Sequence, residues 1–109
     1  FEFLRQFPER VRALGLFSTR AAADTPEGRQ GRMKAVQAIR NEGLEAFSKA
    51  ILPKLLGRTS MESRPALVRR VSKRILANRP EGVADALLAM ADRADSTALL
   101  PGIRCPTLT

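Results

Sequence analysis

Apolar residues recur at helical spacing from the first third of the chain onward. One such stripe is formed by Met33, Ala35, Val36, Ala38 and Ile39. This spacing predicts a helix from about residue 26 to residue 41. Asp24 or Thr25 can cap its N-terminus, and Pro26 suits the first helical position. Gly43 is expected to break the pattern, because glycine lowers helix stability.

A second helix is predicted over residues 44–57. Its apolar seam comprises Leu44, Phe47, Ile51 and Leu55. Pro53 is expected to kink or split this helix, because proline lacks the N–H of the helical hydrogen bond. Gly57 is a natural C-terminal stop.

Two more amphipathic helices follow. The third carries a stripe of Leu67, Val68, Val71, Ile75 and Leu76. Ser63 could cap it, Pro65 lies in its first turn, and Asn78 ends it. The fourth begins near Pro80 and runs to about Arg93. Its apolar positions are Val83, Leu87 and Met90.

Short apolar segments flank these helices. A helical fragment ends at Pro8, and residues 11–17 (VRALGLF) are then apolar on both faces, which is typical of a strand buried on both sides in a parallel sheet. Asp95 and Ser96 are expected to shape the turn before a closing strand at residues 103–108. The predicted fold is mostly α, a four-helix crossover between two short strands.

The amino-acid composition says little about the fold, but it restricts the reactions that the chain could catalyse. The chain of 109 residues has the size of one domain, with 44% hydrophobic residues. It has no histidine, which excludes a histidine-containing catalytic triad within the chain, and no metal-ligand spacing or cofactor motif is present. Cys105 is the one cysteine, expected to be a small buried hydrophobe, and a single thiol fits a reducing cytoplasm. No apolar run is long enough for a membrane span.

Two stretches carry a family resemblance. FPERVRALGLFSTRAAADTPEGRQGR and DSTALLPGIRCPTL, separated by the predicted helices, resemble α/β-hydrolases of the enol-lactonase and small-esterase type. The resemblance implies an internal fragment of that fold. Residues 1–24 would be the end of a core helix, a core strand and a pocket loop. Residues 25–95 would be the helical cap, and residues 96–109 the return loop and the next core strand, parallel to the first.

The same resemblance implies a parent that hydrolyses an ester, lactone or similar small carbonyl substrate through a serine nucleophile. The G-x-S-x-G nucleophile elbow, the acid and the histidine are not in this chain, so no catalytic residue is assigned and the chain alone is expected to be inactive. Ser18 and Thr19 would edge the pocket, although a polar loop with a local cap is the favoured alternative. Substrate-facing positions in the cap would be Phe47, Leu87 and Met90. Core packing between helices is their favoured alternative.

Charge suggests a different class of function. The chain has 19 lysines and arginines against 11 aspartates and glutamates, a net charge of +8. Four of the cations, Arg69, Arg70, Lys73 and Arg74, lie within six residues. They could contact nucleic acid or another anion, which would make the chain a small basic binding module, but a solvated helix face is the favoured interpretation. Unpaired strand edges and an apolar cap underside also predict a homo-oligomer.

Overall fold

The computed structural model describes residues 1–109 as two compact units. The helical unit comprises residues 25–91. The strand unit comprises residues 1–24 together with residues 92–109. The last helix of the helical unit ends at Ala91, two residues before the predicted end near Arg93.

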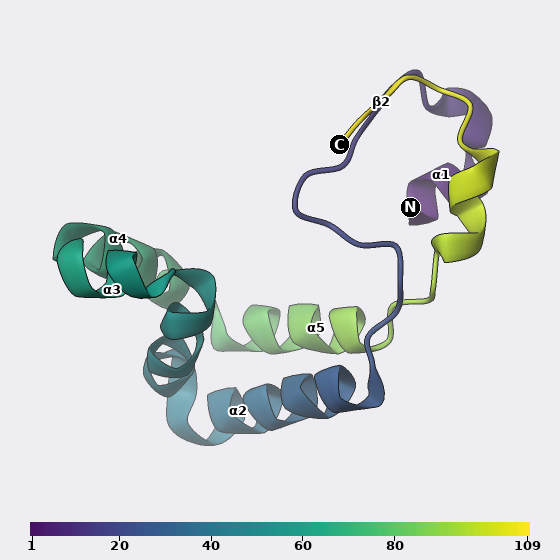
Figure 1. Cartoon of the computed structure of the whole chain (residues 1–109). Helices are drawn as coiled ribbons and strands as arrows, with labels where there is room; N and C mark the ends of the chain where they lie inside the picture. The colour runs from purple at the N-terminus through teal and green to yellow at the C-terminus, as the bar shows by residue number, and fades with distance from the viewer. The chain divides into compact units, whose positions relative to one another are not determined.

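The helical unit contains four helices: α2 (Pro26–Leu55), α3 (Arg58–Ser63), α4 (Pro65–Leu76) and α5 (Pro80–Ala91). The first half of α2 and α5 lie side by side and antiparallel (Figure 1). Apolar side chains of these two helices form the core of the unit. Its buried members are Val36, Ile39, Leu44, Ala84 and Leu87, with Ala35, Phe47, Val83 and Leu88 packed against them. The predicted stripe of the first helix thus meets the stripe of the last.

Gly43 divides α2 as the sequence predicted. Its backbone has φ 80° and ψ −176°, a conformation outside the helical region, and the helix changes direction there. Pro53 does not split the helix, which continues to Leu55. A proline so close to the C-terminus disturbs only the last turn, where carbonyl groups already lack helical partners.

The buried face of the second half of α2 differs from the predicted seam. Leu44, Ser48 and Leu52 are buried, whereas Leu55 is 58% exposed. Ser48 and Ser72 of α4 hydrogen-bond to each other through their hydroxyls at 3.1 Å, so a polar pair occupies part of this contact. The prediction that Leu55 belongs to the apolar seam is wrong, since Leu55 is the last residue of α2 and the buried face there is formed by Ser48 and Leu52.

The helix ends settle two capping predictions. Thr25 is the N-cap of α2, since its Oγ1 accepts a hydrogen bond from the Gly28 amide at 3.1 Å. Ser63 is not a cap of α4. It is the last residue of α3, and its hydroxyl donates to the carbonyl of Thr59 at 2.6 Å. The short helix α3 was not predicted, because its sequence, RTSMES, has one apolar residue and no amphipathic period.

The strand unit contains a parallel pair of short strands, β1 (Leu14–Gly15) and β2 (Thr107–Leu108). Its helical segments are α1 (Glu2–Gln6), η1 (Pro8–Arg10) and η2 (Thr97–Gly102). The amide of Leu14 donates to the carbonyl of Pro106 at 2.9 Å, and the amide of Leu16 donates to that of Leu108 at 2.8 Å. The parallel pairing is thus the one that the hydrolase resemblance implied.

Both strands are shorter than predicted. Only two residues of the 11–17 segment and two of the 103–108 segment are in ladder conformation, and Cys105 lies in a half-buried bend before β2. Each strand has a single neighbour, so no second ladder extends it. The expectation that residues 11–17 are buried on both faces also fails, because Phe17 is 72% exposed.

Candidate functional site

The segment after β1 holds the candidate pocket residues. We call residues 16–24 the β1 loop; it leaves the carboxyl end of a parallel strand, which is where open α/β sheets bind ligands. Ser18 and Thr19 are both exposed in this loop. Ser18 has φ 48°, the left-handed conformation that residues other than glycine rarely adopt. The backbone at Ser18 is therefore held in an uncommon state by its surroundings.

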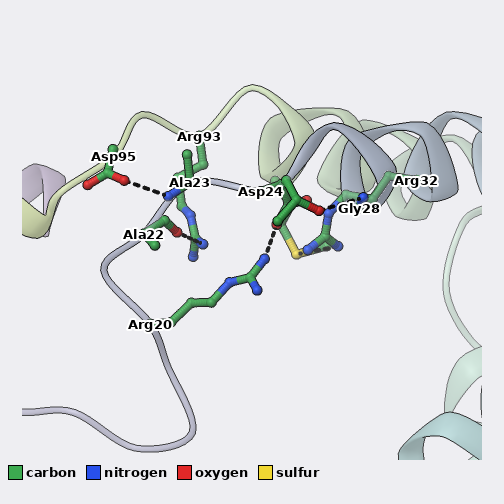
Figure 2. Close-up of polar contacts among 10 residues, drawn as sticks. Arg20, Ala22, Ala23, Asp24, Gly28, Arg32, Arg93 and Asp95 are labelled. Carbon is green, nitrogen blue, oxygen red and sulfur yellow. Dashed lines mark hydrogen bonds and ion pairs between the residues drawn. The ribbon is translucent and has the colours of Figure 1, made fainter.

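Hydrogen bonds fasten the β1 loop to residues 92–97, which we call the return segment. Two main-chain carbonyls of the loop accept hydrogen bonds and one loop amide donates one. Figure 2 shows the bonds at Ala22 and Ala23. The bonds are Ser96 N to Ala21 O at 2.8 Å, Arg93 Nη2 to Ala22 O at 2.7 Å, and Ala23 N to Asp95 Oδ2 at 3.3 Å. Three consecutive loop residues are thus bound by the return segment.

Buried polar side chains support the same region. The carboxylate of Asp24 forms an ion pair with Arg20, and the Asp24 side chain is only 1% exposed (Figure 2). Ser96 is 5% exposed, and its hydroxyl accepts a hydrogen bond from Arg5 Nη2 of α1 at 3.2 Å. Burial of these groups with their partners stabilises one conformation of the loop, because each would otherwise be an unsatisfied buried polar group.

The pKa of the Asp95 carboxyl group is shifted by its hydrogen bonds. Hydrogen bonds from the side chain and then the amide of Thr97 lower the pKa of Asp95 below its ordinary value. The hydrogen bond from the Ala23 amide acts in the same direction, desolvation acts against it, and the positive charge of Arg93 makes the smallest contribution, which also lowers the pKa. The amide of Thr97 lies 2.7 Å from Asp95 Oδ1, so the carboxylate also holds the turn that the sequence predicted at this position.

A pH dependence follows from this lowered pKa. A carboxyl group whose pKa is lower in the folded state stabilises the fold above its unfolded pKa of about 3.9 and loses that contribution as the pH falls through the folded value. Unfolding with urea between pH 7 and pH 2 should therefore show a larger loss of stability for the natural chain than for Asp95→Asn. Asp85→Asn, at an exposed residue whose side chain forms no hydrogen bond, is the matched control. Parallel profiles for the natural chain and Asp95→Asn would contradict this role.

Arg93 is a functional candidate that sequence analysis missed. The sequence placed it at the end of a helix, whereas it lies beyond α5 and binds the carbonyl of Ala22. Its Nε is buried and has no hydrogen-bond partner. A bond to a main-chain carbonyl has no residue pattern in sequence, so no signal would have identified it.

The predicted pocket residues of the helical unit are only partly brought together. Leu87 is 8% exposed in the core of this unit, and the half-buried Phe47 packs against the same cluster. Met90 is 39% exposed, and its sulfur lies 3.4 Å from Arg32 Nη1. Phe47 also borders a groove of about 220 Å³ along α2. The remaining lining residues are Ala35, Ala38, Glu42, Ala46, Ala50, Ile51 and Lys54.

The predicted anion contacts all lie on one side of α4. Arg69, Arg70, Lys73 and Arg74 are exposed, and their side chains form no ion pair. The opposite side carries the apolar stripe, of which no residue is fully buried. The structure therefore presents four cations to solvent, as both the anion-binding and the solvated-face interpretations require.

Metal binding and membrane spanning were the two remaining kinds of site to compare with the structure. No three aspartate, glutamate or cysteine residues lie close enough together to hold a metal ion. None of the helices combines the length and the apolar character needed to cross a membrane.

Comparison with known proteins finds an esterase. The structure of a thermophilic esterase from Thermogutta terrifontis, solved with malate bound, matches 96% of this chain with 37% sequence identity and a TM-score of 0.84. This chain covers 39% of the esterase chain, which is well under half of its length. No family model matches the chain, and neither does any curated protein.

The comparison and the topology agree on the fold. Two short parallel strands joined through four helices, together with the esterase match, make this chain a helical cap with flanking strands from an α/β-hydrolase-like fold.

Proposed function

We propose that this chain is the cap segment of a serine hydrolase that acts on an ester, lactone or similar small carbonyl substrate. The observation that carries the proposal is the 37% identity with an esterase over 96% of the chain. In this function the helical unit roofs the substrate pocket, excludes water and selects the acyl or alcohol group. The nucleophile, acid and histidine come from sequence outside these 109 residues.

Reaction with a fluorophosphonate probe and hydrolysis of p-nitrophenyl esters and lactones test this function. A longer protein that carries this segment is expected to be labelled at one serine and to hydrolyse at least one of these substrates. The 109-residue chain alone is expected to give neither signal, because it has no histidine to activate a serine. Turnover by the chain alone, or a longer protein that is folded and unreactive, would refute the proposal.

We also infer that the isolated chain self-associates. Phe17 follows β1 and Leu108 lies in β2, and each of these strands has one edge without a neighbouring strand. Both side chains are more than half exposed. Such edges pair readily with another copy. Light scattering after size exclusion should give at least a dimer mass, and a Leu108→Lys variant should shift it toward the monomer, whereas Thr109→Lys serves as the charge control. A concentration-independent monomer would contradict self-association.

A basic binding module is the competing function. It rests on the four exposed cations of α4, Arg69, Arg70, Lys73 and Arg74, and not on the esterase match. Its distinguishing sign is an affinity for nucleic acid that falls steeply with salt concentration, because phosphate contacts release counterions.

A further inference from the structure

The return segment holds the middle of the β1 loop by hydrogen bonds. Its residues bind the loop at Ala21, Ala22 and Ala23 in succession, and none of the three loop groups is a side chain. Alanine side chains offer no polar group of their own to fix the loop. Besides the Arg20–Asp24 ion pair, the conformation of the loop therefore depends on donors and acceptors of residues 93–96.

We propose that Arg93 is a positioning residue, which holds the β1 loop at the carboxyl end of β1 in its binding conformation. Its bond to the Ala22 carbonyl is the shortest of the three, and it is made by a charged donor, which forms a stronger hydrogen bond than a neutral one. The charge of the same side chain also lowers the pKa of Asp95 slightly, as the smallest of several causes. The bond to the Ala22 carbonyl is therefore the observation that carries the role of Arg93.

The unpaired Nε of Arg93 makes this role separable from ordinary packing. A buried donor without a partner destabilises the fold, so this atom lowers stability and its removal does not cost a hydrogen bond. Lysine at this position keeps a charged donor for the Ala22 carbonyl and removes the unpaired Nε. Methionine keeps the length and apolar stem but removes the donor altogether. The two variants therefore separate the bond to the loop from the bulk of the side chain.

The functional consequence rests on the proposed hydrolase function. Ser18 and Thr19 belong to the loop that Arg93 fixes, and Ser18 has the left-handed backbone noted above. A loop released from the return segment would populate many conformations, and only a fraction of them would bind substrate. Apparent affinity falls in proportion to that fraction.

Amide hydrogen exchange measured by NMR on this chain tests the fastening directly. The Ser96 amide is the main probe, because its bond to Ala21 does not involve Arg93. In Arg93→Met this amide should exchange at least tenfold faster, and in Arg93→Lys it should remain within about threefold of the natural rate. The amides of Ile39 and Leu87, in the helical unit, should be unchanged and so report that the variant is folded.

Arg104→Met is the matched control, since Arg104 is an exposed arginine of the same unit without a hydrogen bond. It should leave the Ser96 amide unchanged. A Ser96 rate in Arg93→Met equal to that of the natural chain would overturn the proposal. So would equal acceleration in the methionine and lysine variants, which would indicate a packing role.

Kinetics on the longer protein test the consequence for substrate binding. Arg93→Met should raise KM at least fivefold and by a larger factor than it lowers kcat, and Arg93→Lys should restore most of the loss. Equal loss of kcat with no change in KM would overturn the positioning role. If the longer protein has no hydrolase activity at all, the proposed function fails, and the exchange experiment decides the role of Arg93 by itself.

Discussion

Replacing Leu87 with alanine is expected to lower the free energy of unfolding by about 2–5 kcal/mol, the range for buried leucines. Leu87 is 8% exposed and lies in the cluster that joins α5 to α2, with Val36, Ile39 and Leu44 on the facing helix. The truncation to alanine leaves a cavity in this cluster, and few other buried side chains are present that could move to fill it. For a small domain with a total stability of about 5–15 kcal/mol, this loss removes a large part of the margin.

Chemical denaturation followed by circular dichroism measures this effect. The matched control is Met90→Ala, one turn further along α5, where the side chain is 39% exposed. This change should cost about 1 kcal/mol or less. A similar, small loss for both variants would contradict the core position of Leu87. The comparison therefore bears on the two interpretations of Leu87 in the sequence, namely core residue and pocket lining.

The two helices that form the contact between α2 and α5 could be predicted from the sequence because their apolar residues recur at helical spacing, whereas their pairing was not predicted. The stripe around Val36 and Ile39 and the stripe around Leu87 each have helical period, and two exposed apolar stripes stabilise each other by leaving water. The prediction of the buried face was less accurate for the residues of α2 after Gly43. The seam there includes Ser48, a hydroxyl paired with another hydroxyl, and hydrophobicity alone assigns such a residue to the surface.

The length of each strand depends more on the presence of neighbouring strands than on its amino-acid composition. VRALGLF has strand character throughout, yet only Leu14 and Gly15 form a ladder. Pro106 has no amide hydrogen to donate, and each strand has one neighbour. The parallel pairing itself followed from the hydrolase resemblance and not from the strand pattern.

The fastening of the β1 loop shows a different limit of sequence analysis. Asp95 and Ser96 were expected in a turn, and they do form one. Their bonds to Ala21 and Ala23, more than seventy residues away, go to or from main-chain groups that every residue except proline shares. A sequence pattern identifies residue types, so it cannot single out which main-chain group an arginine or aspartate will bind.

Replacing Gly43 with alanine is expected to destabilise the fold by about 1–3 kcal/mol. At φ 80° and ψ −176° the backbone is in a region that is essentially restricted to glycine, although a Cβ added there would meet no atom within 4 Å. The cost is therefore conformational and not steric crowding by neighbours. The alternative, a straight α2, would move Leu44 away from its place in the cluster with Ala84 and so lose core packing.

Gly31→Ala is the matched control for this change, because Gly31 lies in the same helix with no atom within 4 Å of an added Cβ and without a positive φ. There alanine should stabilise the helix by up to about 1 kcal/mol. Thermal unfolding should thus show a lower midpoint for Gly43→Ala and an equal or higher midpoint for Gly31→Ala. If both variants were stabilised, α2 would tolerate a continuous helix through residue 43. The direction change that brings Leu44 into the core would then not be required by the fold.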